Sequence, residues 1–450
     1  MEHNVIDSSL KSILRVTIPM LITLMGENFM YVIDRFMLAG YSMDSMNAVM
    51  LAGNFVSIFT IMFMGIASSA EIFVGQYNGS EQYEKLAAPT WQMIYMSVGA
   101  GMIGVLMAVF SEYLNPLFPP YYMKDGVAYL KILMFFIVFP PLRASISAFF
   151  IGQGKTKIIS VSITVGVTLN LILDYLLIYG IGNIIPRMGA EGAAIATVVS
   201  EFVQGLILAV VFFSKSNRKI FKTLKNCRFQ KKLFWDCLRV GTPLSLGNFA
   251  SLLAWYLLQS FVSFVSQDMA TIYSIGSNLY VLFMFAGEGM QKAMASIAAN
   301  MIARRDLRAI RKTWRIFVLI SIFFGLIITL PLTFCSDWVF KILSMLPDDI
   351  SALYSEIRMV LYIAAVDVCL ENILLVMLGL LAAGGDTKYS IAVNQTCLWV
   401  LVMIPCWIMY STHTLTSVPV IYGFIAVWPC VSLFFVYRRY KSLKWYNKLV

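Results

Sequence analysis

The stretch Leu14–Pro19 reads LRVTIP, and 224 residues later Leu238–Pro243 reads LRVGTP. Two further pairs recur at nearly the same spacing: Thr90-Trp91 with Thr313-Trp314, and Gly154–Lys157 with Gly385–Lys388. Three matches in the same order indicate a duplicated unit. Because long apolar stretches are shared between the two copies, the repeat predicts two similar helical bundles with a seam between them, which is where carriers of this kind bind a solute.

The composition is that of a membrane protein. Hydrophobic residues make up 59% of the chain and charged residues 13%, about half of the charged share of a soluble domain. A membrane span needs roughly 20 apolar residues. Twelve stretches meet this need, at about 13–36, 47–73, 91–111, 128–150, 158–180, 192–213, 236–264, 271–297, 314–335, 356–381, 390–410 and 417–437.

We therefore predict an all-α integral membrane protein with twelve transmembrane helices in two pseudo-symmetric six-helix lobes. The predicted N-lobe covers residues 1–213 with spans 1–6, and the predicted C-lobe covers 236–450 with spans 7–12. Residues 214–235 form the longest break and carry eight Lys and Arg residues. They are predicted to be a basic cytoplasmic linker.

The net charge of +10 is explained by topology. Of the 34 Lys and Arg residues, only Arg35, Lys124, Arg187 and Lys341 lie in or beside odd-numbered loops. The positive-inside rule then places both termini in the cytoplasm, and predicts a multi-pass protein of the cell inner or plasma membrane. Nucleic acid is excluded as a partner. The basic loop 302–315 is interpreted as an orientation signal that can also touch anionic lipid.

Cysteine and histidine usage argues against an enzyme. All seven cysteines lie in the second half without a CxxC pair, and the only histidines are His3 and His413. No structural zinc site and no clustered nucleophile is credible with this set. The glycine-rich Gly152–Lys157 lacks the GxxxxGK[ST] spacing of a phosphate loop. We expect no enzyme activity, no cofactor apart from a coupling ion, and a monomer.

Ionisable residues inside predicted spans are the candidate functional residues, because each costs about 2.5–3.5 kcal/mol on insertion scales. Asp34 lies on the first span. Asn170 and Asp174 lie one turn apart on span 5, and Thr197 lies on span 6. Carboxylate, amide and hydroxyl oxygens suit a hard cation such as sodium, and a carboxylate pair also suits a proton. The alternatives are a structural hydrogen bond for Asn170 and a bond to its own helix for Thr197.

A secondary acidic site is predicted from Asp367, Glu371, Glu27 and Glu288. Asp367 and Glu371 lie one turn apart on span 10, where two carboxylates repel unless a cation or proton intervenes. Glu27 lies on span 1, seven residues before Asp34. Glu288 lies one turn before Lys292 on span 8, and an internal ion pair is the alternative interpretation there.

Three motifs resemble multidrug and toxic compound extrusion (MATE) transporters: Tyr31–Gly40, Gly152–Lys157 running into Leu169–Asp174, and Met188–Thr197. The resemblance covers most of the chain and is stronger in its first half. It implies a twelve-helix, two-lobe antiporter with a coupling site at Asp34, Asn170, Asp174 and Thr197. The second lobe departs from the family pattern, because Ser251 aligns with a span-7 carboxylate of some members, and Asp367 stands where others have an aromatic residue.

The predicted function is secondary active antiport. A small-molecule, cationic or drug-like compound would be exported in exchange for Na⁺ or H⁺ by alternating access. The nearest alternative is a lipid-linked oligosaccharide or lipid flippase of the same superfamily. Such a flippase would need a cationic cavity, and two extra spans, which the sequence does not show, would favour it. A membrane enzyme lacks a reactive cluster, and a channel would conduct without coupling.

Overall fold

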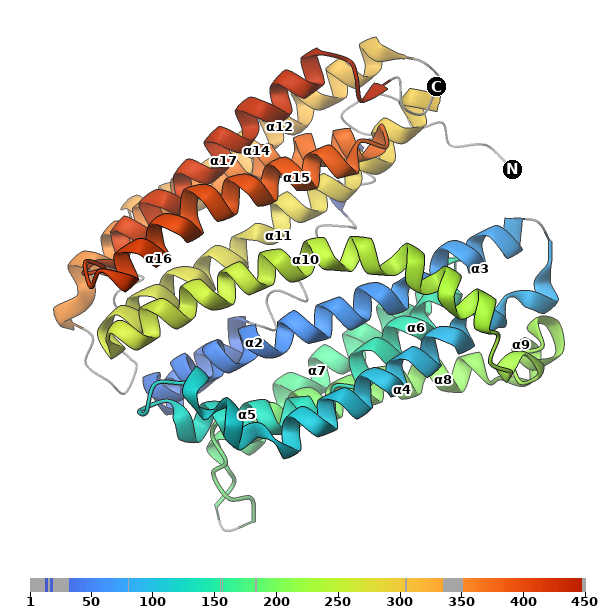
Figure 1. The fold of residues 1–450 in the computed structure, drawn as a ribbon, viewed down its shortest axis with the longest axis horizontal. Coiled ribbons are helices and arrows are strands. Elements are labelled where there is room, and N and C mark those ends of the chain that lie inside the picture. The colour runs from blue at the N-terminus through green and yellow to red at the C-terminus, as the bar shows by residue number, and fades with distance from the viewer. Residues whose placement is uncertain are drawn as a thin grey trace. The chain divides into compact units, whose positions relative to one another are not determined.

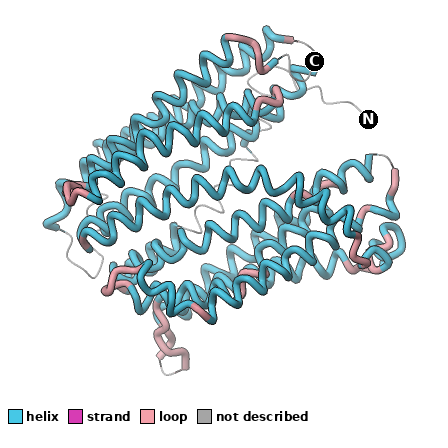
Figure 2. Tube along the Cα trace, in the orientation of Figure 1, coloured by secondary structure: helices cyan, strands magenta, loops and turns pink. Residues whose placement is uncertain are grey.

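The computed structural model describes residues 13–14, 17–18, 32–79, 81–153, 155, 157–182, 184–303, 306–334 and 351–446. Within these residues the chain is helical, and its only β feature is an isolated bridge between Ile181 and Ile185 (Figure 2). A helix satisfies all of its backbone hydrogen bonds within one segment, as the interior of a bilayer demands. The predicted all-α membrane fold is confirmed.

The chain forms two compact units, residues 33–260 and residues 1–32 with 261–450. Residues 32–41 are helical, and from Ile33 onward this helix belongs to the first unit. Its further helices are α2 (Met43–Ser68), α3 (Ala70–Gly79), α4 (Ala87–Val109), α5 (Met123–Phe135), α6 (Phe139–Ile151), α7 (Lys157–Tyr179), α8 (Ala190–Phe212), α9 (Lys215–Phe221) and most of α10 (Lys231–Val265) (Figure 1).

The second unit contains the end of α10 and the remaining helices. These are α11 (Gln267–Ala303), α12 (Leu307–Phe334), α14 (Tyr354–Ala383), α15 (Thr387–Leu398), a π-helical turn (Trp399–Met403), α16 (Ile404–Ser411) and α17 (Val418–Lys441). Short 3₁₀ turns lie at Tyr83–Lys85, Ser111–Leu117, Lys225–Cys227 and Ser351–Leu353. The two units are defined by contacts between residues and do not test where one lobe of a repeat ends and the next begins. The predicted lobe limits at 213 and 236 therefore stay a prediction.

Nine helical segments of the described residues are long and apolar enough to cross a membrane, and a tenth is the bent pair α5 and α6. The predicted span 128–150 is therefore two helices that meet at 41°. Pro140 and Pro141 explain the break, because proline fits the first turn of α6 but cannot continue α5. Most of the predicted first span lies outside the described residues.

Each unit has its own apolar core. In the first unit, Leu51, Phe118 and Leu130 are buried together with Tyr256 of α10. In the second unit, Met290, Phe317 and Trp445 belong to a cluster that joins α11, α12 and α14 to the chain after α17. These cores hold the helices that carry the candidate residues.

The predicted linker is a folded segment. It contains α9 and the 3₁₀ turn Lys225–Cys227, and it packs on the start of α4. Trp91 Nε1 donates to the Thr223 carbonyl at 2.6 Å, and Gln92 Nε2 donates to the Arg228 carbonyl at 3.1 Å. The backbone N–H of Gln230 donates to Gln92 Oε1 at 2.9 Å. The linker thereby covers the end of α4 that begins at Ala87.

Candidate cation site

The α7 helix has one narrow buried face. Its buried residues are Ser162, Gly166, Asn170, Asp174 and Ile178, each four positions after the last. A spacing of four residues places side chains above one another on one side of a helix. The predicted pair Asn170 and Asp174 therefore lies in the middle of this face, and both residues are 0% exposed.

The buried face of α7 packs closely against α8. Ser162 Oγ donates to the Gln204 carbonyl at 2.9 Å, and the missing side chain of Gly166 makes room for the Gln204 side chain. Nearer the other end, Gly192 lies against the backbone of Leu177. A helix pair held at both ends in this way has a fixed antiparallel register, which places Thr197 level with Asn170.

Thr197 donates its hydroxyl proton to the Ala193 carbonyl at 3.0 Å. The bond to its own helix, which was one alternative for this residue, is therefore present. A hydroxyl oxygen that donates still carries two acceptor lone pairs. Thr197 thus keeps the capacity to bind a cation or to accept a further hydrogen bond.

Asp34 is held next to α7 by a tyrosine. Tyr179, the last residue of α7, donates its hydroxyl to the Met37 carbonyl at 2.6 Å. The carboxyl groups of Asp34 and Asp174 lie close enough to interact electrostatically, and Asp34 also interacts with Arg35. The structure therefore brings the two predicted carboxylates together.

Several polar atoms of this cluster are buried and lack a hydrogen-bond partner among the described residues. They are Asp34 Oδ1, both carboxylate oxygens of Asp174, and both polar atoms of the Asn170 amide. Buried polar groups in proteins are nearly always paired. Two carboxylates only accept hydrogen bonds, so their close approach requires a proton or cation between them. The two carboxylates and the amide gathered here suit a hard cation such as sodium, and the Thr197 hydroxyl lies at a similar level on the neighbouring helix α8.

The secondary acidic residues lie in the other unit. Asp367 and Glu371 are buried on α14, and neither Asp367 oxygen nor Glu371 Oε2 has a partner among the described residues. Asp367 interacts electrostatically with Tyr422 and Cys430 of α17. Glu288 lies half-buried on α11, and Glu27 lies outside the described residues. Of the four predicted residues of the secondary acidic site, Asp367 and Glu371 are thus buried.

An ion pair inside the first unit was missed by the sequence reasoning. Arg143 of α6 donates to both carboxylate oxygens of Glu201 of α8, with Nε–Oε2 at 2.7 Å and Nη2–Oε1 at 3.3 Å. Glu201 lies one helical turn after Thr197. The signal available in the sequence was a basic residue within predicted span 4 and a single acidic residue in the middle of predicted span 6.

Sequence comparisons place this chain among known membrane transporters. The family model described as MatE matches residues 19–176 and 243–408, more than half of the chain. A "Probable multidrug resistance protein NorM" of Thermotoga maritima is 25% identical over 362 residues, 76% of each chain. The "Probable multidrug resistance protein YoeA" of Bacillus subtilis is 23% identical over 413 residues, which are 90% of this chain and 88% of the relative.

Solved structures share the fold. One is described as the inward-facing conformation of a multidrug resistance MATE family transporter of the MOP superfamily. It has a TM-score of 0.80 and 17% identity, and covers 92% of this chain and 94% of its own. A second, a MOP superfamily transporter from Pyrococcus furiosus whose binding pocket is described as having reverse polarity, has a TM-score of 0.72 and 19% identity over 97% of both chains.

Proposed function

This chain belongs to the MatE family of multidrug efflux transporters, and from that premise we propose that it is a secondary active antiporter. It exports organic cations or drug-like compounds in exchange for Na⁺ or H⁺ by alternating access. The observation that carries this proposal is the cluster of Asp34, Asn170 and Asp174, whose buried polar atoms have no partner among the described residues. A driving ion bound here would satisfy these atoms, whereas a purely structural polar cluster would be internally paired.

In the proposed cycle the coupling ion binds between Asp34 and Asp174 from the outside. The Asn170 amide oxygen and the Thr197 hydroxyl complete the oxygen set. A membrane potential of 100 mV supplies about 2.3 kcal/mol for each charge that enters. Binding relieves the repulsion of the two carboxylates and changes the fit of residues 32–41 against α7, which favours the state that releases substrate outward.

The substrate is proposed to be cationic or at least not anionic. Carboxylate oxygens of Asp34, Asp174, Asp367 and Glu371 are buried without a hydrogen-bond partner among the described residues, and they favour a positive charge nearby. The flippase alternative needs cations to hold a pyrophosphate, and Arg143, which is partly buried in the first unit, is already engaged by Glu201. The Pyrococcus relative shows that pocket polarity differs within the superfamily, so the charge of the cargo has to be measured directly.

The test is efflux from proteoliposomes that contain the purified protein and a fluorescent organic cation. A sodium gradient and a pH gradient are applied separately, so that the coupling ion is identified. We expect Asp34→Asn to abolish gradient-driven efflux. The matched control is Glu191→Gln, which neutralises an exposed carboxylate at the start of α8 and should transport normally. Unchanged coupled efflux in Asp34→Asn would remove Asp34 from the mechanism.

The same assay decides the role of the second acidic pair. Glu371→Gln replaces a carboxyl that is 6% exposed with an amide of the same shape. We propose that this carboxylate contacts the cationic substrate, so the variant should raise the substrate concentration needed for half-maximal efflux and leave the ion requirement unchanged. A changed ion requirement would instead assign Glu371 to the coupling site.

Location and assembly are also proposals. We propose a monomer in the cell inner or plasma membrane with both termini in the cytoplasm. Cys227 in the folded linker is exposed and serves as a reporter. In a variant that keeps only this cysteine, a membrane-impermeant maleimide should label inside-out vesicles and leave intact cells unlabelled. Labelling in intact cells would reverse the orientation.

A further inference from the structure

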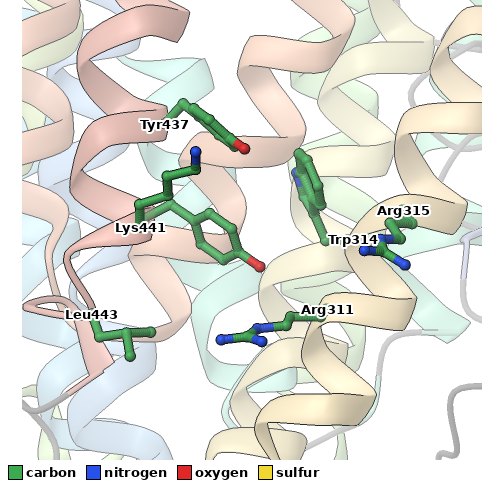
Figure 3. Close-up of a pocket in the computed structure, with 7 residues that line it drawn as sticks. Arg311, Trp314, Arg315, Tyr437, Lys441 and Leu443 are labelled. Atoms are coloured by element: carbon green, nitrogen blue, oxygen red, sulfur yellow. The ribbon is translucent and has the colours of Figure 1, made fainter.

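A pocket of about 260 Å³ lies in the second unit, where α12 begins and α17 ends. Seven residues line it: Arg311, Trp314, Arg315, Tyr437, Tyr440, Lys441 and Leu443. Three of them are cations and none is a carboxylate. In Figure 3 the side chains of Arg311 and Trp314 from α12 face those of Tyr437 and Lys441 from α17. The electrostatics of this pocket therefore favour an anion.

The aromatic residues hold the cations in place. Trp314 stacks on Tyr437 with ring centroids 6.2 Å apart and lies 5.5 Å from Tyr440. Lys441 Nζ sits 4.8 Å from the centre of the Tyr437 ring, and Arg311 interacts electrostatically with Tyr440. No carboxylate of the described residues forms an ion pair with Arg311 or Lys441 in the structure. Among the described residues, the positive charges of Arg311 and Lys441 are held by aromatic rings and have no carboxylate as an ion-pair partner.

The repeat supplies an internal comparison. Trp314 is the counterpart of Trp91, and each packs on the end of the last long helix of its half: Trp91 lies 6.4 Å from Phe212 of α8, as Trp314 lies near Tyr437 of α17. The Trp91 indole N–H is satisfied by the Thr223 carbonyl of the folded linker. The Trp314 indole N–H is buried without a partner among the described residues. The first copy thus has an acceptor from its own chain, and the described part of the second copy supplies none.

The positions around the two tryptophans differ in charge. At the repeat offset of 223 residues, Ala88 and Gln92 of α4 correspond to Arg311 and Arg315 of α12. Gln92 binds the linker through its amide. Where the first copy has a neutral surface covered by its own chain, the second has two guanidinium groups and an unpaired N–H. The missing acceptor in the second copy is therefore expected to be negatively charged.

We propose that this pocket binds the phosphate of an anionic phospholipid headgroup. Arginine suits phosphate because its planar fork donates two parallel hydrogen bonds, and a phosphate oxygen would accept the Trp314 N–H as the Thr223 carbonyl accepts that of Trp91. The pocket lies at the ends of two predicted spans, where tryptophan and tyrosine mark the level of the headgroups and basic residues attract anionic lipid. It is smaller than a typical pocket for a drug-sized ligand, roughly 300–1,000 Å³, and the proposal does not depend on which compound or ion the protein transports.

The test is native mass spectrometry of the delipidated full-length protein, titrated with phosphatidylglycerol or with phosphatidylcholine of the same chains. We expect retention of phosphatidylglycerol and little retention of phosphatidylcholine. The pocket variant carries three changes: Arg311→Gln, Arg315→Gln and Lys441→Gln. Each cation near a membrane surface contributes about 1 kcal/mol, so this variant should bind phosphatidylglycerol on the order of 100-fold more weakly.

The matched control removes the same charge from the same helix ends outside the pocket: Arg308→Gln, Lys312→Gln and Arg438→Gln. It should change binding less than about threefold, since none of these three side chains lines the pocket and their charges act only through screened, longer-range attraction. Equal losses in the two triple variants would reduce the effect to surface charge and overturn the pocket. Equal binding of phosphatidylcholine would overturn an anionic ligand.

Two further arms separate the remaining explanations. Trp314→Phe keeps the ring and removes the N–H, so it should weaken phosphatidylglycerol binding roughly tenfold, as expected for a hydrogen bond to a charged group, without altering thermal unfolding. An unchanged affinity would contradict the assigned acceptor. Inorganic phosphate should fail to displace the lipid at equal concentration; displacement would show that free phosphate, rather than lipid, is the ligand.

Discussion

Replacing Asp174 with asparagine tests whether the cluster on α7 exists for binding or for stability. Asp174 is 0% exposed and neither of its carboxylate oxygens has a partner among the described residues. A charged aspartate at the centre of a span costs about 2.5–3.5 kcal/mol on insertion scales. The amide of asparagine has the same shape and no charge. In the absence of the cation, the free energy of unfolding of Asp174→Asn should therefore equal that of the wild type or exceed it by up to about 3 kcal/mol.

The same substitution should abolish stabilisation by the coupling ion. An ion present at 100 times its dissociation constant stabilises the folded state by about 2.7 kcal/mol, and the variant should lose this increment together with ion-driven efflux. The assay is a thermal unfolding curve of the purified protein, recorded with and without sodium and at two pH values. Transport is measured in parallel in proteoliposomes.

Asp125→Asn is the matched control. Asp125 lies in the first turn of α5 and accepts a hydrogen bond from the Ser45 hydroxyl. Its neutralisation removes a satisfied interaction near a helix N-terminus, so it should destabilise by about 1 kcal/mol and leave the ion response intact. An Asp174→Asn protein that is less stable than the wild type, yet still stabilised by the ion, would refute the binding role.

Three more outcomes are expected. Gly166→Val should destabilise by about 1–3 kcal/mol because its side chain would meet Gln204 across the α7–α8 contact; Gly205→Ala on α8, which has open space around it, should stay within about 1 kcal/mol of wild type or gain, and equal losses in thermal unfolding would contradict the close contact. Arg143→Gln should cost about 2–3 kcal/mol, since it strands the Glu201 carboxylate, and adding Glu201→Gln should recover most of this; a double-mutant cycle without coupling would disprove the pair. Asn170→Ala should weaken the ion response roughly tenfold at unchanged stability, as read from sodium titrations of unfolding temperature, and a large loss of stability would instead show that the amide is structural.

The sequence was informative about the fold because its main signals are local. Apolar stretches of span length and the asymmetric placement of Lys and Arg need no tertiary information. The spacing of Asn170 and Asp174 was equally local, since four residues along a helix share a face. That Asp34 meets Asp174 was not deducible from spacing. It depends on how residues 32–41 lie against α7, which Tyr179 fixes through the Met37 carbonyl.

Features that arise from packing between distant segments escaped prediction. The sequence analysis predicted one span at 128–150 because the apolar run is continuous there. It did not predict the break between α5 and α6, which Pro140 and Pro141 produce. The linker was identified by its charge, yet its contacts with Trp91 and Gln92 require two segments more than 130 residues apart to meet. For the same reason, the pocket beside Trp314 could not be predicted from the sequence, where its basic residues indicated orientation and contact with anionic lipid in general.

The candidate cation site draws all four residues from one compact unit, residues 33–260. Such a site is not assembled by the closing of two bodies around an ion, so occupancy alone cannot report which way the transporter is open. Ion flux can power export only to the extent that this one unit holds the ion with unequal strength in its alternative shapes. A tenfold inequality stores about 1.4 kcal/mol per cycle, and thermodynamic reciprocity then requires the exported compound to alter ion affinity by that same factor.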